Sequence, residues 1–133
     1  MTYQQVAEGL ATRLATISGV NAFAYPAPNP PVPAAIVAPG PSEYDQTFRN
    51  SLTRISFVVR MLVGRADDDT AADSLYAYLD PTGSSSVKAA IEGDKTLGGV
   101  VDDACVTRHD TPGLFDYGGQ PLLGVEFTVE VML

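Results

Sequence analysis

The sequence predicts an α+β domain in which helices cover one face of a mainly antiparallel sheet. Three observations support this: an amphipathic helix pattern near the N-terminus, a long alternating strand near the middle, and two strand patterns near the C-terminus that suit a hairpin. Helix and strand patterns do not alternate regularly, which argues against a doubly wound parallel fold. With 133 residues, the chain has the length of a single domain, spanning 1–133.

The first elements are a helix and two short strands. Apolar residues recur at helical spacing after the potential capping residue Thr2, namely Val6, Leu10, Leu14 and Ile17. Short strands are expected at 21–25 and 34–38, joined by a proline-rich crossover that cannot be an inner strand. The segment 42–50 has no clean period, and its two aromatic residues require a packing partner.

The most regular strand pattern covers 52–63. Its odd-numbered residues from 55 to 63 are apolar, whereas Arg54 and Arg60 lie on the alternate face. This alternation predicts a sheet with one packed face and one face that is partly open to solvent or to another subunit.

Two helices and a hairpin complete the prediction. A helix is expected at 67–79, and a short helix at 87–92 follows a capping residue within 84–86. Strands are expected at 100–108 and 123–131. Because the intervening segment 110–121 contains three glycines and two prolines, it is interpreted as a long hairpin loop.

Charge and residue counts disfavour several classes of function. Eight basic residues against sixteen acidic ones give a net charge of −8, which disfavours broad binding to nucleic acid or anionic lipid. Cys105 and His109 are the only residues of their types, so an internal disulfide is impossible and a Cys/His zinc site lacks ligands. The lone thiol and the lack of a signal-peptide pattern lead us to expect a protein made and assembled in the cytosol.

Three possible chemical motifs do not support catalysis. Cys105 and His109 are four positions apart on an expected strand, a separation of about 13 Å that exceeds hydrogen-bond reach. The sequence 93–96 resembles a phosphate loop but has Asp94, which repels phosphate, before its lysine. The acidic triplet 67–69 is explained more simply by helix capping than by a divalent cation. No catalytic, cofactor-binding or metal-binding residue is assigned.

Several stretches of sequence resemble small head-to-tail proteins of actinobacterial tailed phages. These stretches are VPAAIVAPGPSEYDQTF, VVRMLVG, YLDPTGSSSVKAAIEGD, TLGGVVDDACV and LLGVEFTVEV, and together they run from about Val32 to Val131. The most similar group is the tail terminators of long-tailed phages. The resemblance implies a non-enzymatic virion protein without a cofactor, assembled in the host cytoplasm.

The same resemblance implies a set of partners. Tail terminators form a ring, usually of six subunits, that caps the head-proximal end of the tail tube, stops its polymerisation and joins it to the head connector. The expected partners are therefore other copies of the chain, the tail tube protein and a neck protein of the connector. DNA would pass through the lumen without specific binding, which an acidic surface favours.

Candidate interface residues are those that a monomeric core leaves unexplained. They lie in 42–50, on the outward face of 52–63 and in 110–121, and they are Tyr44, Phe48, Arg54, Arg60, Leu114, Phe115 and Tyr117. We expect the two arginines to meet acidic residues of an adjacent subunit, with apolar loop residues supplying most of the affinity. Two alternatives stay open: a neck, stopper or head-completion protein, and a small hydrolase or metal- or ligand-binding domain that uses acidic residues.

Overall fold

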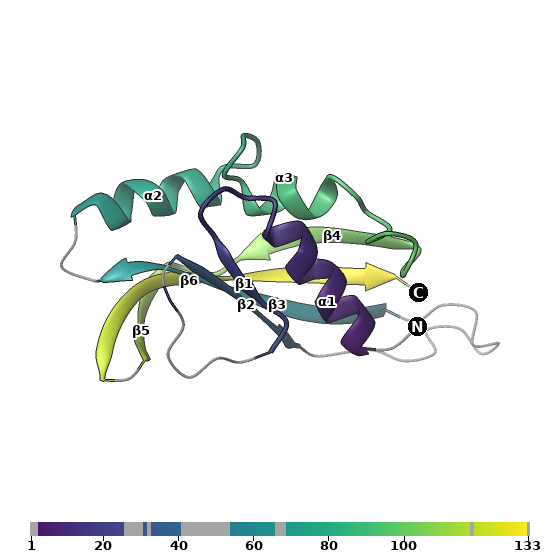
Figure 1. Ribbon diagram of the computed structural model, residues 1–133, viewed down its shortest axis with the longest axis horizontal. Coiled ribbons are helices and arrows are strands. Elements are labelled where there is room, and N and C mark those ends of the chain that lie inside the picture. The colour runs from purple at the N-terminus through teal and green to yellow at the C-terminus, as the bar shows by residue number, and fades with distance from the viewer. Residues whose placement is uncertain are drawn as a thin grey trace.

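Three helices pack on one face of a six-stranded sheet in the computed structural model, which describes residues 3–25, 31, 33–40, 54–65, 69–117 and 119–132 (Figure 1). The helices are α1 (Tyr3–Leu14), α2 (Asp69–Leu79) and α3 (Val87–Glu92). The strands are β1 (Asn21–Phe23), β2 (Ala34–Pro39), β3 (Arg54–Arg65), β4 (Asp103–His109), β5 (Gly113–Tyr117) and β6 (Gln120–Met132). The predicted α+β class is confirmed, and the short third helix has the predicted bounds.

The sheet is mainly antiparallel, as predicted. Its strand order is β1-β2-β3-β6-β4, and β5 pairs with β6 beside this path. Only the pairing of β1 with β2 is parallel among the described strands. The long strands β3 and β6 lie at the centre, from Arg54 opposite Met132 to Arg65 opposite Leu122.

The main core lies between the helices and one face of the sheet. Its α1 residues include Val6, Leu10 and Leu14, and its β3 residues are Ile55, Phe57, Val59, Met61 and Val63. All of them are buried, which confirms the packed face predicted for 52–63. On the opposite face, a smaller cluster forms from Ile36, Leu62 and Leu122, with Phe23 and Phe115 packed against it.

The interpretation of 110–121 as a long loop is wrong. Residues 113–117 form β5, which pairs with the first part of β6, and Tyr117 lies opposite Gln120. The turn contains Gly119 in a left-handed conformation, with φ of 79°. In a hairpin closed by Tyr117 and Gln120, the nitrogen of Pro121 points away from β5. Pairing between β3 and β6 ends at Leu122, so the missing N–H of Pro121 interrupts neither described ladder.

The β5–β6 hairpin curves away from the helical layer (Figure 1). Register shifts interrupt the pairing of β6 with β3 between Leu62 and Gly64, and with β4 between Val106 and Arg108. Bulges of this kind bend a sheet and increase its twist. β4 and β5 therefore act as two successive partners along one side of β6, and the second partner leaves the plane of the helix-covered sheet.

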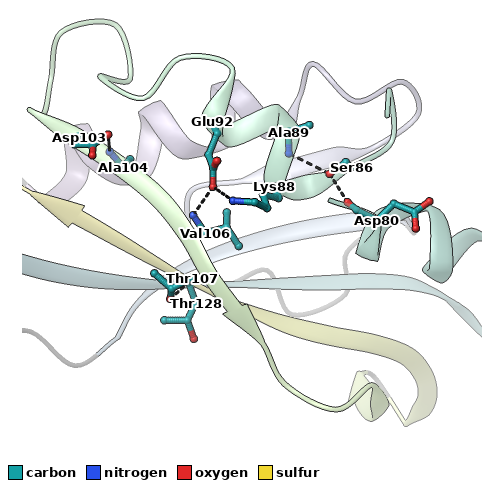
Figure 2. A network of polar contacts seen from close by, with 10 residues as sticks. All are labelled: Asp80, Ser86, Lys88, Ala89, Glu92, Asp103, Ala104, Val106, Thr107 and Thr128. Carbon is teal, nitrogen blue, oxygen red and sulfur yellow. Dashed lines mark hydrogen bonds and ion pairs between the residues drawn. The ribbon is translucent and has the colours of Figure 1, made fainter. Parts of the chain in front are cut away.

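Ser86 links the end of α2 to the start of α3 (Figure 2). Its Oγ accepts a hydrogen bond from the Ala89 N–H at 3.0 Å and donates one to the Asp80 carbonyl. Ser86 is the N-cap of α3 and is buried, so water cannot replace these contacts without a structural opening.

Replacing Ser86 with alanine is expected to lower the free energy of unfolding by about 2 kcal/mol, because it removes the cap and leaves the Ala89 N–H and the Asp80 carbonyl without this partner. Urea denaturation measures the change. Ser84→Ala is the matched control, since Ser84 is exposed, and we expect it to change stability by less than about 0.5 kcal/mol. Equal effects of the two substitutions would show that the cap does not contribute.

Candidate interaction surface

Both candidate arginines form ion pairs with glutamates of the same chain. Arg60 lies directly opposite Glu126 on β6, and its Nη2 is 2.8 Å and its Nε 3.2 Å from Glu126 Oε2. Arg54 forms a looser pair, with 3.7 Å between its Nε and Glu130 Oε2. The acidic partners that were expected in an adjacent subunit are therefore present within the chain. Whether the two arginines also lie at an interface stays a prediction.

Phe115 packs between Arg60 and the central strands. The guanidinium carbon of Arg60 lies 4.7 Å from the centroid of the Phe115 ring, which is a cation–π geometry. The Phe115 ring also packs closely against Gly124. A Cβ added at Gly124 would lie only 3.0 Å from Phe115 Cδ2. Because Phe115 also packs against the cluster that contains Leu62, the hairpin is fixed to the open face of the sheet at its base.

Leu114 points to the other face of the hairpin. It lies opposite Leu123, which packs against the main core, so both side chains are on the helix-covered side. Since the hairpin curves away from the helices, Leu114 is 63% exposed (Figure 1). The Leu114 side chain is thus exposed to solvent, although the next residue of the same strand, Phe115, packs against the sheet.

The structure brings together some of the candidate interface residues. Arg60 and Phe115 are in contact, Leu114 is adjacent to them on the opposite face, and Arg54 lies six residues away along β3. The side chain of Tyr117 lies outside the described part of the structure, as do Tyr44 and Phe48.

Sequence reasoning missed the role of three residues, Gly124, Glu126 and Glu130. The partners of the two glutamates depend on the β3–β6 register. The alternation of Glu126, Thr128 and Glu130 with apolar residues was the available signal, because outward acids on one strand attract outward bases on its neighbour. Gly124 was one glycine among twelve, and nothing in the sequence marks it as a contact point.

A double-mutant cycle on Arg60 and Glu126 is expected to show a coupling energy of about 1 kcal/mol, because both side chains are partly shielded from water and face each other across neighbouring strands. The variants are Arg60→Gln, Glu126→Gln and their combination, compared by urea denaturation. The same cycle on the exposed pair Arg108 and Asp110 is the control, with an expected coupling below about 0.5 kcal/mol. Coupling in the first cycle no larger than in the control would contradict this assignment.

The structure adds a second reason to reject a Cys105–His109 dyad. Cys105 lies opposite Glu130, whereas His109, after the register shift in β4, lies opposite the core residue Phe127. The two side chains therefore point to opposite faces of the sheet. Cys105 lies on the open face of the sheet and is partly buried. His109 is exposed, and its Nδ1–H donates a hydrogen bond to the Asp110 carbonyl at 2.9 Å.

A pocket of about 310 Å³ lies beside β4, with a lining of Leu79, Pro81, Lys88, Val106, Thr107, Arg108, His109 and Phe127. Its ionisable lining is basic, and Lys88 and Arg108 form ion pairs with Glu92 and Asp110. The hypothesis of a hydrolase or ligand-binding domain requires acidic residues, so this pocket gives it no support.

Of the two remaining motifs, the structure describes the 93–96 segment but not the side chains of the acidic triplet 67–69. In the 93–96 segment, which is a turn, the Asp94 carboxylate accepts hydrogen bonds from the Thr96 hydroxyl at 2.9 Å and the Gly98 N–H at 3.0 Å. Hydrogen bonds to Thr96 and Gly98 hold the pKa of Asp94 below its usual value. Of the acidic triplet 67–69, no side chain lies in the described part. Elsewhere, the described residues contain no group of three or more His, Cys, Asp or Glu side chains that suits a metal.

Comparison with known proteins does not identify a family. No family model matches the chain, and no curated protein has significant sequence similarity to it. Among the described helices, none has the length and apolar character needed to cross a membrane.

Proposed function

We propose that this chain is a tail terminator of a long-tailed phage, a ring-forming virion protein that caps the head-proximal end of the tail tube. The resemblance of five sequence stretches motivates the proposal. The structural observation that supports it is Leu114, a large apolar residue held 63% exposed on a hairpin that is anchored at its base.

The hairpin has the properties of a preformed contact element. Phe115 fixes its base on the open face of the sheet, so little conformational entropy is lost when Leu114 is buried by a partner. An exposed apolar side chain on a rigid support is favoured as an interface anchor, because its burial contributes affinity without rearrangement.

The charges of the open face have a smaller role in this proposal than the sequence indicated. Arg54 and Arg60 already have acidic partners within the chain, so a neighbouring subunit gains little by supplying others. Apolar contacts at the hairpin then provide most of the affinity between subunits. The net charge of −8 suits a lumen through which DNA passes without binding.

Incubation with purified phage parts tests the assigned position. Tail tubes assembled without this protein and tailless heads are each mixed with the purified chain and imaged. We expect the chain to bind one end of the tubes and to stop their further growth when tube protein is added. Binding to tailless heads with no binding to tubes would contradict the terminator proposal and support a neck or stopper protein.

A further inference from the structure

The outer edge of β4 is an edge of the sheet, and carboxylates bind two of its backbone N–H groups, those of Ala104 and Val106. β4 pairs with β6 on one side and is the last strand of the sheet order. On its other side, the Val106 N–H donates to Glu92 Oε2 at 3.1 Å (Figure 2). Since strand residues alternate in hydrogen-bonding direction, the Ala104 N–H points the same way, and it donates to Asp103 Oδ1 at 3.0 Å.

Glu92 is held in this position by its own helix. It is at the end of α3, where Lys88, one turn earlier, forms an ion pair with the same oxygen that binds the Val106 N–H. Burial alone would raise the pKa of Glu92, but the Lys88 ammonium and the Val106 N–H together lower it below its usual value. The carboxylate is therefore charged and preorganised at the strand edge near neutral pH.

An unprotected strand edge pairs readily with another strand, and folded proteins block such edges with charged side chains. Glu92 Oε2 occupies the position that the carbonyl oxygen of an added strand would take at Val106. Removing the Glu92 carboxylate would leave the Val106 N–H without an acceptor in the geometry of a sheet that continues outward, whereas the Ala104 N–H would be held only by the neighbouring Asp103 side chain.

The most favourable added strand is β4 of a second copy. If two β4 edges pair antiparallel about a two-fold axis at Cys105, Ala104 of each copy lies opposite Val106 of the other. Both outward-directed residues are then used, and each side chain stays on its own face of the sheet. The same register places Cys105 of one copy directly opposite Cys105 of the other, as a pair without hydrogen bonds whose Cβ atoms are about 5 Å apart.

We propose that β4 is a strand-addition surface for a second copy of this chain and that Glu92 keeps it closed. This inference does not rest on the proposed function. It specifies which contact between copies is blocked: a two-fold β4 contact, which cannot build a head-to-tail ring.

Disulfide trapping tests the proposal, because Cys105 is the only cysteine and any disulfide-linked dimer reports its pairing with a second Cys105. Wild type, Glu92→Ala and Glu92→Gln are incubated with oxidised glutathione and analysed by non-reducing electrophoresis. Glu92→Ala is expected to form the linked dimer on the order of tenfold faster than wild type, since no charge-assisted hydrogen bond must be displaced. Glu92→Gln should give a smaller increase than Glu92→Ala, because its amide oxygen still accepts from Val106 but is uncharged and forms no ion pair with Lys88.

Two further variants keep the result interpretable. Glu8→Ala removes an exposed carboxylate of α1 and is the control for lost negative charge, with an expected rate equal to wild type. Lys88→Met removes only the ion pair that positions Glu92, and it should give a smaller increase even if Glu92→Ala does not fold. Folded variants at Glu92 and Lys88 that form the dimer no faster than wild type would overturn the proposal, as would equal acceleration by Glu8→Ala.

Discussion

Replacing Gly124 with alanine is expected to lower the free energy of unfolding by about 3 kcal/mol. The added Cβ would lie 2.6 Å from the Met61 carbonyl oxygen, 3.0 Å from Phe115 Cδ2 and 3.1 Å from Leu62 Cδ2. The first of these is a backbone atom in the central β3–β6 pairing, so relief requires the two longest strands to separate locally. Urea denaturation measures the loss of stability.

Gly113→Ala is the matched control for Gly124→Ala. Gly113 is the register partner of Gly124 across the β5–β6 hairpin, and a Cβ built on it meets no described atom within 4 Å. We expect the control to change stability by less than about 0.5 kcal/mol. If Gly124→Ala were as stable as Gly113→Ala, the close packing of Phe115 on the open face would be wrong.

Replacing Leu114 with aspartate is expected to weaken assembly between copies by at least about 30-fold while leaving the fold intact. Leu114 is 63% exposed, so its substitution should cost less than about 0.5 kcal/mol of stability. Burying a carboxylate in the apolar contact proposed for the hairpin would instead carry a large desolvation penalty. Light scattering over a range of concentrations measures the assembly, and urea denaturation measures the fold.

Tyr76→Asp provides the control for Leu114→Asp. Tyr76, on α2, is 66% exposed, so the two variants introduce the same charge at similarly exposed apolar positions. We expect Tyr76→Asp to assemble like wild type. Equal loss of assembly in both variants would indicate a general effect of added negative charge, and no loss in Leu114→Asp would remove the hairpin from the interface.

The helices and the central strands were predictable because their apolar periods are strong and local. α3 has the predicted bounds because Ser86 supplies an N-cap and Gly93 directly follows its last residue. The packed face of β3 follows from strict alternation over 55–63. Each of these signals is contained within a dozen residues and depends on no distant contact.

The β5 strand was missed because glycine and proline usually mark loops. The position of Pro121 shows why that rule fails here: its nitrogen faces a side of β6 where the described β3 ladder has already ended. The sequence carries no local signal for that end point, which depends on how two distant strands align.

For the interaction surface, the sequence predicted candidate residues but not the contacts between them. Arg60 and Phe115 were both selected, but their contact with each other and with Glu126 depends on the alignment of three strands. The closure of β4 by Glu92 has the same origin, since α3 meets the strand edge only in the folded chain. Tertiary register therefore gives the arginines acidic partners within the same chain, and their contact with another subunit stays a prediction.

The solution mass of the purified chain, measured by light scattering and followed by negative-stain imaging of the same sample, tests the ring proposal most directly. The proposal predicts a mass near six times 14.0 kDa and annular particles, either in the free protein or after tail tubes are added. A chain that stays a monomer in both conditions, with no particles on the tubes, would contradict it.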